Sequence, residues 1–133
     1  MPKSENQKQK LLYLKDFFER ETDEEHPVSM ADILDFLAAH EIKAERKSIY
    51  SDIQTLQDFG MDIVLQKGKT GGYYLASREF ELPELKLLVD AVQSSKFLTD
   101  RKSMALIRKL EGLCSRHEGS RLRRQVVVSG RCI

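Results

Sequence analysis

The sequence lacks several features that define large classes of protein. No apolar run approaches the roughly 18 residues that a membrane span needs, so no membrane partner is expected. Residues 1–8 contain no apolar segment of the kind found in secretory signals, and we therefore expect a cytoplasmic protein. Cys114 and Cys132 form no Cys-x-x-Cys pair and have no His-x₃₋₅-His pair beside them. A zinc site is not expected.

Groups of residues typical of enzymes are also missing. His26, His40 and His117 stand apart in the sequence, without an i, i+4 partner and without a serine or cysteine in a nucleophile setting. No pair of carboxylates is distinguished from the many charged residues around it. We therefore expect no catalytic residue, no metal, no cofactor and no enzymatic activity.

Net charge is only +1, but the charges are unevenly distributed. Residues 11–42 contain two basic and nine acidic side chains, whereas residues 96–133 contain ten basic and three acidic ones. A protein with one basic side can bind nucleic acid despite a neutral total, so net charge does not decide the function.

Three helices are expected in the N-terminal half. Apolar residues at three- and four-residue spacing predict the first over about residues 7–21. A near capping box at residues 29–32 predicts a second that ends near Ala39. The third is predicted over about residues 45–59, because Gly60 is typical of a helix end. The side chains expected to face the core are Leu11, Leu12, Leu14, Phe17, Phe18, Ile33, Leu34, Phe36, Leu37, Ala38, Ile49, Ile53, Leu56 and Phe59.

A β-hairpin is expected after the third helix. Residues 62–66 and 73–75 have strand character, and the glycines of the intervening segment 67–72 suit a turn with positive φ.

Two further helices and a strand are expected in the C-terminal half. Pro83 suits a first helical position, and Thr99 suits the cap of the next helix. Residues 125–128 resemble a strand without a visible partner. The expected inward side chains of the two helices are Leu85, Leu88, Val89, Val92, Leu106, Ile107, Leu110 and Leu113.

Residues 28–60 carry the functional hypothesis. Two short helices joined by a turn at residues 40–43 have the helix-turn-helix layout, whose second helix enters the major groove of DNA. Polar side chains remain on the outer face of the third helix once its apolar positions turn inward, and two lysines lie at the hairpin tip. The predicted DNA-binding residues are Arg46, Lys47, Ser48, Tyr50, Ser51, Gln54, Lys67 and Lys69.

The same segment resembles a known family. An Ile-Tyr-x-Asp-Ile-x-x-Leu core occupies residues 49–56, and Gly-Gly-Tyr-Tyr-Leu follows at residues 71–75. At this spacing the two patterns resemble the N-terminal domain of WYL-domain transcriptional regulators, which is a DeoR-like winged helix. Residues 82–115 are similar to the linker helices of that family, and residues 121–129 look like the first strand of its ligand-sensing WYL domain.

Two departures from the family limit what the resemblance implies. Glu45 stands where the family often has Ser or Thr, so the capping of the recognition helix is atypical. Most of the sensing domain is absent. The resemblance therefore implies that the unknown effector ligand is bound by the missing C-terminal domain.

Together these observations predict a mainly α fold with a small β-hairpin. We expect a winged helix-turn-helix at residues 1–78, a helical linker and possible dimerisation segment at 79–120, and the start of a truncated sensing domain at 121–133. The expected function is sequence-specific transcriptional regulation, with double-stranded DNA and a second copy of the chain as partners.

Three alternatives stay open. The apolar stripe that begins at Leu85 is either the dimer contact or part of the core of one subunit. The winged helix is alternatively a protein–protein interaction module without DNA binding, which its acidic first helices allow. A redox or ligand sensor that uses Cys114 is the third.

Overall fold

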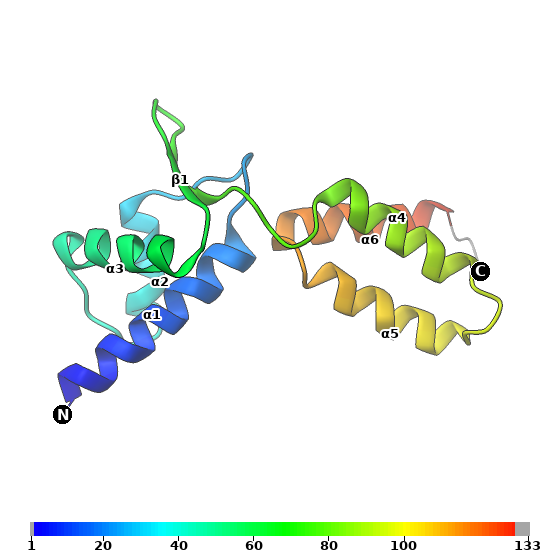
Figure 1. Cartoon of the computed structure of the whole chain (residues 1–133), viewed down its shortest axis with the longest axis horizontal. Coiled ribbons are helices and arrows are strands. Elements are labelled where there is room, and N and C mark those ends of the chain that lie inside the picture. The colour runs from blue at the N-terminus through cyan, green and yellow to red at the C-terminus, as the bar shows by residue number, and fades with distance from the viewer. Residues whose placement is uncertain (1, 130–133) are drawn as a thin grey trace. The chain divides into compact units, whose positions relative to one another are not determined.

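The computed structural model describes residues 2–129, which fold into two compact units with a boundary after Ser77. Among these residues there are six helices and one antiparallel hairpin of two strands (Figure 1). The expected fold class, mainly α with a small β-hairpin, is confirmed.

The first unit is a winged helix-turn-helix. Its elements are α1 (Pro2–Glu21), α2 (Met30–Ala39), α3 (Arg46–Phe59), β1 (Ile63–Gln66) and β2 (Gly72–Leu75). All three helices and both strands contribute to one apolar core, which contains Leu14, Phe17, Phe18, Met30, Ile33, Leu37, Ile42, Ile49, Ile53, Leu56, Ile63 and Leu75.

Local interactions define the two helices of the helix-turn-helix. The backbone N–H of Asp32 donates to Ser29 Oγ at 3.1 Å, and the N–H of Ser29 donates to Asp32 Oδ2 at 3.0 Å, which confirms the capping box at the start of α2. After α2, Glu41 adopts a φ of 62°, and the N–H of Ile42 returns to Leu37 O at 2.9 Å. Gly60, with a φ of 125°, ends α3 as expected.

The hairpin is attached to the segment that precedes α2. Val64 pairs with Tyr74 across the two strands. Val28 then adds a short antiparallel bridge to β2, because its N–H donates to Tyr73 O at 2.8 Å and its carbonyl accepts from the N–H of Tyr73 at 2.7 Å. The sequence did not predict this bridge. It ties the hairpin to the entrance of the helix-turn-helix.

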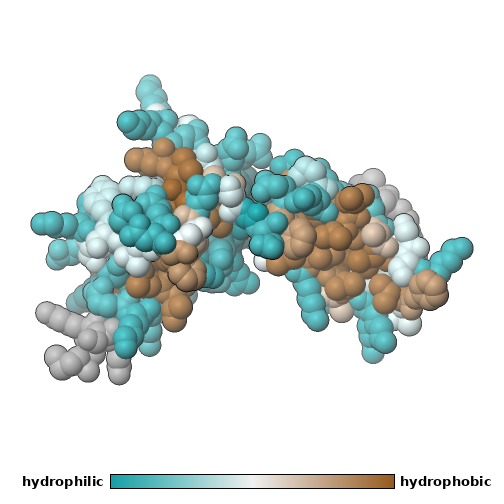
Figure 2. All heavy atoms as spheres, in the orientation of Figure 1, coloured by the Kyte–Doolittle hydropathy of each residue, from teal (hydrophilic) through white to brown (hydrophobic). Residues whose placement is uncertain are grey.

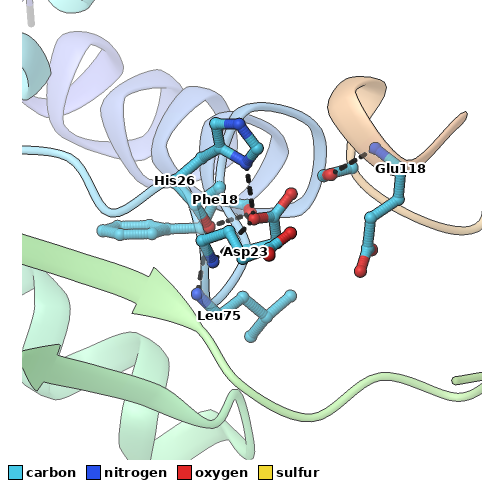
Figure 3. A network of polar contacts seen from close by, with 8 residues as sticks. Phe18, Asp23, His26, Leu75 and Glu118 are labelled. Carbon is cyan, nitrogen blue, oxygen red and sulfur yellow. Dashed lines mark hydrogen bonds and ion pairs between the residues drawn. The ribbon is translucent and has the colours of Figure 1, made fainter. Parts of the chain in front are cut away.

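The end of α1 provides a second attachment (Figure 3). Thr22 Oγ1 donates to Phe18 O at 2.7 Å and accepts from the N–H of Leu75 at 3.0 Å. In the loop that follows, His26 Nδ1 lies 2.7 Å from Asp23 Oδ1, and the same carboxylate oxygen accepts from the N–H of Glu25 at 3.0 Å. The chain between α1 and α2 is therefore held by side-chain hydrogen bonds.

The second unit consists of α4 (Leu82–Ser94), α5 (Asp100–Glu111) and α6 (Arg116–Ser129). Thr99 caps α5, as expected, by accepting from the N–H of Lys102 at 3.2 Å. The core contributed by these helices and the residues between them contains Leu85, Val89, Ile107, Cys114, Leu122 and Val126.

The strand expected within residues 121–129 is wrong, because these residues belong to α6. Leu122 and Val126 are four residues apart, so both reach the core of the second unit from one helical face. Tertiary burial therefore outweighs the strand preference of the valines. The segment expected to begin a separate domain at residue 121 groups with residues 78–120, and residues 130–133 lie outside the described part of the chain.

Several apolar residues expected inside are exposed instead. They are Leu12, Ala38, Phe59, Leu106 and Leu113. Leu85 and Val89 are fully buried within their own unit, and Leu88 and Val92 pack beside them. The apolar stripe that begins at Leu85 is therefore mainly part of the core of this unit.

Gly72 generates a prediction about stability. A Cβ at this position would lie 2.4 Å from Val28 O, so Gly72→Ala must displace the bridge between Val28 and β2. We expect a loss of about 1–3 kcal/mol in the free energy of unfolding, since two backbone hydrogen bonds are disturbed. Urea unfolding followed by tyrosine emission measures this, because Tyr13, Tyr50, Tyr73 and Tyr74 all lie in the first unit.

Gly112→Ala is the matched control. A Cβ there would meet Lys109 O at 3.4 Å, an ordinary contact, and the φ of Gly112 is −76°. Its tyrosine-detected unfolding should match that of the wild type. Equal midpoints for Gly72→Ala and wild type would contradict a tight contact at Val28.

Candidate nucleic-acid interface

The inner face of α3 is defined by burial. Ile49, Ile53 and Leu56 are buried in the core of the first unit at positions that share one side of the helix. Because that side is fixed against the core, the opposite side must face outward.

The outer face of α3 carries most of the predicted site residues. Arg46, Lys47, Ser51 and Gln54 are exposed, and Tyr50 keeps 52% of its surface accessible. Neither Arg46 nor Lys47 forms an ion pair with another residue of the described chain. These five side chains are available to a partner.

Ser48 differs from the expectation. It is half-buried, and its hydroxyl accepts a hydrogen bond from Lys10 Nζ of α1. The side chain is therefore engaged within the protein. The structure does not place Ser48 with the outward group.

Gln54 has a defined orientation. Its Nε2 donates to Asp58 Oδ1 at 3.0 Å, one turn further along α3. Because a carboxylate only accepts hydrogen bonds, the amide nitrogen must face Asp58, and the amide oxygen is left without that partner. Sequence reasoning missed Asp58, although the i, i+4 spacing of Gln and Asp is a recognised stabilising pair on helices.

Tyr50 of α3 affects the ionisation of Tyr73 in the hairpin. The pKa of the Tyr73 phenol in β2 is raised above its ordinary value of 10.0, first by burial and then by the proximity of Tyr50. The phenol of Tyr73 is therefore neutral at physiological pH.

The hairpin tip presents two cations. Lys67 and Lys69 are exposed on either side of Gly68, whose φ of 123° is readily adopted only by glycine. Neither lysine forms an ion pair with a described residue. A Cβ on Gly71 would lie 2.1 Å from Gln66 O, so the return of the tip to β2 also requires glycine.

A buried ion pair between α1 and α3 was also not predicted from the sequence. Lys10 Nζ of α1 lies 2.7 Å from Asp52 Oδ2 of α3, with 1% of the lysine side chain and 13% of the aspartate side chain exposed. A signal was present. Lys10 stands four residues before Leu14 and Asp52 three residues after Ile49, so each charge falls on the buried face of its helix.

Exposed polar and basic side chains are thus grouped on the outer face of α3 and at the tip of the hairpin. Within the described part of the chain, no three or more His, Cys, Asp and Glu side chains are grouped to hold a metal ion. No helix among the described residues has the length and apolar character needed to cross a membrane. Comparison of the chain with protein-family models, curated proteins and solved structures finds no match.

Proposed function

We propose that the protein is a sequence-specific DNA-binding transcriptional regulator that inserts α3 into the major groove. The observation that carries the proposal is the exposed polar face of α3, on a helix fixed to the core by Ile49, Ile53 and Leu56. This face holds two cations that form no ion pair with any residue whose side chain the structure describes. A major groove about 12 Å wide admits an α-helix of about 10–12 Å diameter.

The exposed side chains divide into two roles. Arg46 and Gln54 read base edges, since their side chains make bidentate contacts with guanine and adenine respectively. Lys47, Tyr50 and Ser51 position the helix through phosphates or a neighbouring base. Asp58 supports Gln54, because the amide held by its carboxylate keeps its oxygen free to accept from the amino group of adenine.

Lys67 and Lys69 bind the phosphate backbone. Both are exposed at the tip of a hairpin that is tied to the loop before α2 through Val28. The hairpin is therefore fixed relative to α3, and its charges add sequence-independent affinity beside the groove.

A homodimer is part of the proposal. Helix-turn-helix proteins commonly bind two half-sites as symmetric dimers. Figure 2 shows apolar side chains gathered on the visible face of the second unit. Exposed apolar residues of this unit include Leu87, Phe97, Met104, Leu106 and Leu113. By the family resemblance, an effector would be bound by a sensing domain outside these residues.

The same apolar side chains favour a second candidate, a protein-interaction module without DNA binding. Leu87 keeps 71% and Phe97 keeps 99% of its surface accessible. Salt separates the two functions. Affinity for duplex DNA falls steeply between about 50 and 200 mM salt, whereas an apolar contact does not weaken in this way.

Alanine substitution tests the reading face. Arg46→Ala and Gln54→Ala should each cost about 1–3 kcal/mol in binding and relax preference at one base position. The measurement is fluorescence anisotropy with duplexes selected by the wild-type protein from random DNA. Arg20→Ala, an exposed arginine of α1, is the control and should bind like the wild type. Unchanged affinity and base preference in both test variants would overturn the assignment of this face.

The lysines of the hairpin should behave differently. Lys67→Ala and Lys69→Ala should weaken binding equally for all sequences and reduce the slope of log affinity against log salt by about one each. Titrations at several salt concentrations with selected and scrambled duplexes measure both effects. A loss confined to the selected duplex would assign the lysines to base contact instead.

The dimer has its own signature. Selected sites should contain two inverted half-sites with centres about 10–10.5 base pairs apart or a multiple of that spacing. Sedimentation of the full chain mixed with such a duplex, compared with the chain alone, should show two copies bound per duplex. Asymmetric sites bound by a single copy would exclude the dimer while leaving DNA binding intact.

A further inference from the structure

We propose that Lys10 is a positioning residue, whose buried ammonium group fixes the setting of α3 and thereby of the side chains that read bases. The inference rests on the DNA-binding function proposed above. Lys10 does not itself contact DNA, because only 1% of its side chain is exposed.

Lys10 of α1 contacts two side chains of α3. Lys10 Nζ of α1 lies 2.7 Å from Asp52 Oδ2 and donates a hydrogen bond to Ser48 Oγ. Ser48 and Asp52 are one turn apart on α3, so a single cation holds both. Ser48 follows Arg46 by two residues, and Asp52 precedes Gln54 by two. The contacts of Lys10 therefore hold the part of α3 that lies between the two residues assigned to base contact.

The apolar contacts of α3 cannot supply the same restraint. Ile49, Ile53 and Leu56 hold the helix to the core by burial, which is non-directional. The hydrogen bond to Ser48 depends on the direction and distance of particular atoms, and the ion pair with Asp52, whose Oδ2 accepts no hydrogen bond, depends on the distance between the charges. A binding site must be held within about 0.5 Å and 10–20° of its working geometry, which is a stricter demand than burial alone makes.

Stability alone does not account for the pair. Removing two charges from water costs nearly as much as their attraction returns, and apolar replacements of similar volume are often equally stable. Exposed positions are the usual places for Lys and Asp, yet both are sequestered here. The pairing also neutralises Asp52, so that this carboxylate does not oppose the approach of α3 to phosphates.

The test replaces the ion pair with apolar side chains of similar shape in the full-length chain. Lys10→Met alone leaves Asp52 buried without its cation and is expected to unfold the first unit, so the informative variant is the double substitution Lys10→Met with Asp52→Leu. Lys15→Met with Glu19→Leu is the matched control. This pair also lies on α1, at 3.0 Å, but is about 40% exposed.

We expect the double variant to keep the urea midpoint of the wild type or exceed it. Its affinity for a duplex selected by the wild type should fall about ten- to hundredfold, because displaced reading groups lose their contacts. Its affinity for a scrambled duplex should stay unchanged, since no exposed charge is altered. In the absence of DNA, the double substitution should speed amide hydrogen exchange in residues 48–56 more than it speeds exchange in α2. The control pair should change none of these quantities.

Retention of wild-type discrimination between selected and scrambled duplexes by the double variant would overturn the role of Lys10, and so would unchanged exchange in α3. A parallel loss of stability and of affinity for both duplexes would overturn it as well, because that result is a plain structural effect. Failure of the proposed function has a different signature: the wild-type protein would show no salt-dependent binding to any duplex.

Discussion

The structure depends on the burial of one face of α3. Ile49, Ile53 and Leu56 complete the core formed with α1 and α2, and because they occupy a single side, the polar residues between them are turned outward. The exposed face is therefore a consequence of folding rather than a separate feature. A substitution that rotated α3 would expose apolar surface and withdraw Arg46 and Gln54 at the same time, so stability and recognition are coupled through this helix.

The hairpin depends on the same unit through backbone contacts. Val28 binds Tyr73 by two hydrogen bonds, and Thr22 binds the N–H of Leu75. These contacts connect β2 with the segment between α1 and α2, and β1, the partner strand of β2, contacts α3. The lysines at the tip thus project from a scaffold shared with α3.

Features set by neighbouring residues could be predicted from the sequence. The capping box at Ser29, the helix end at Gly60 and the hairpin turn all depend on local chemistry. Features set by distant residues could not. The bridge of Val28 to Tyr73 and the pairing of Lys10 with Asp52 join segments that only the fold brings together, and α6 is helical because the core receives Leu122 and Val126. For the site, the outward direction of five side chains of α3 could be predicted from the spacing of its apolar residues. The engagement of Ser48 within the protein could not be predicted, because its hydrogen-bond partner Lys10 lies on α1.

A net charge near zero is compatible with nucleic-acid binding once the placement of each charge is considered. Along α3, Asp52 is compensated by a lysine behind the helix and Asp58 is hydrogen-bonded to Gln54. Arg46 and Lys47 have no such partner in the described chain, and neither do the two lysines of the hairpin tip. The field at short range is set by nearby uncompensated charges and is screened beyond roughly 10 Å in salt, so distant acidic residues contribute little at this surface. Exposed Glu45, which precedes Arg46 and makes no hydrogen bond that caps α3, adds one negative charge at its edge. The total charge measures the whole chain, whereas a duplex would meet only this face.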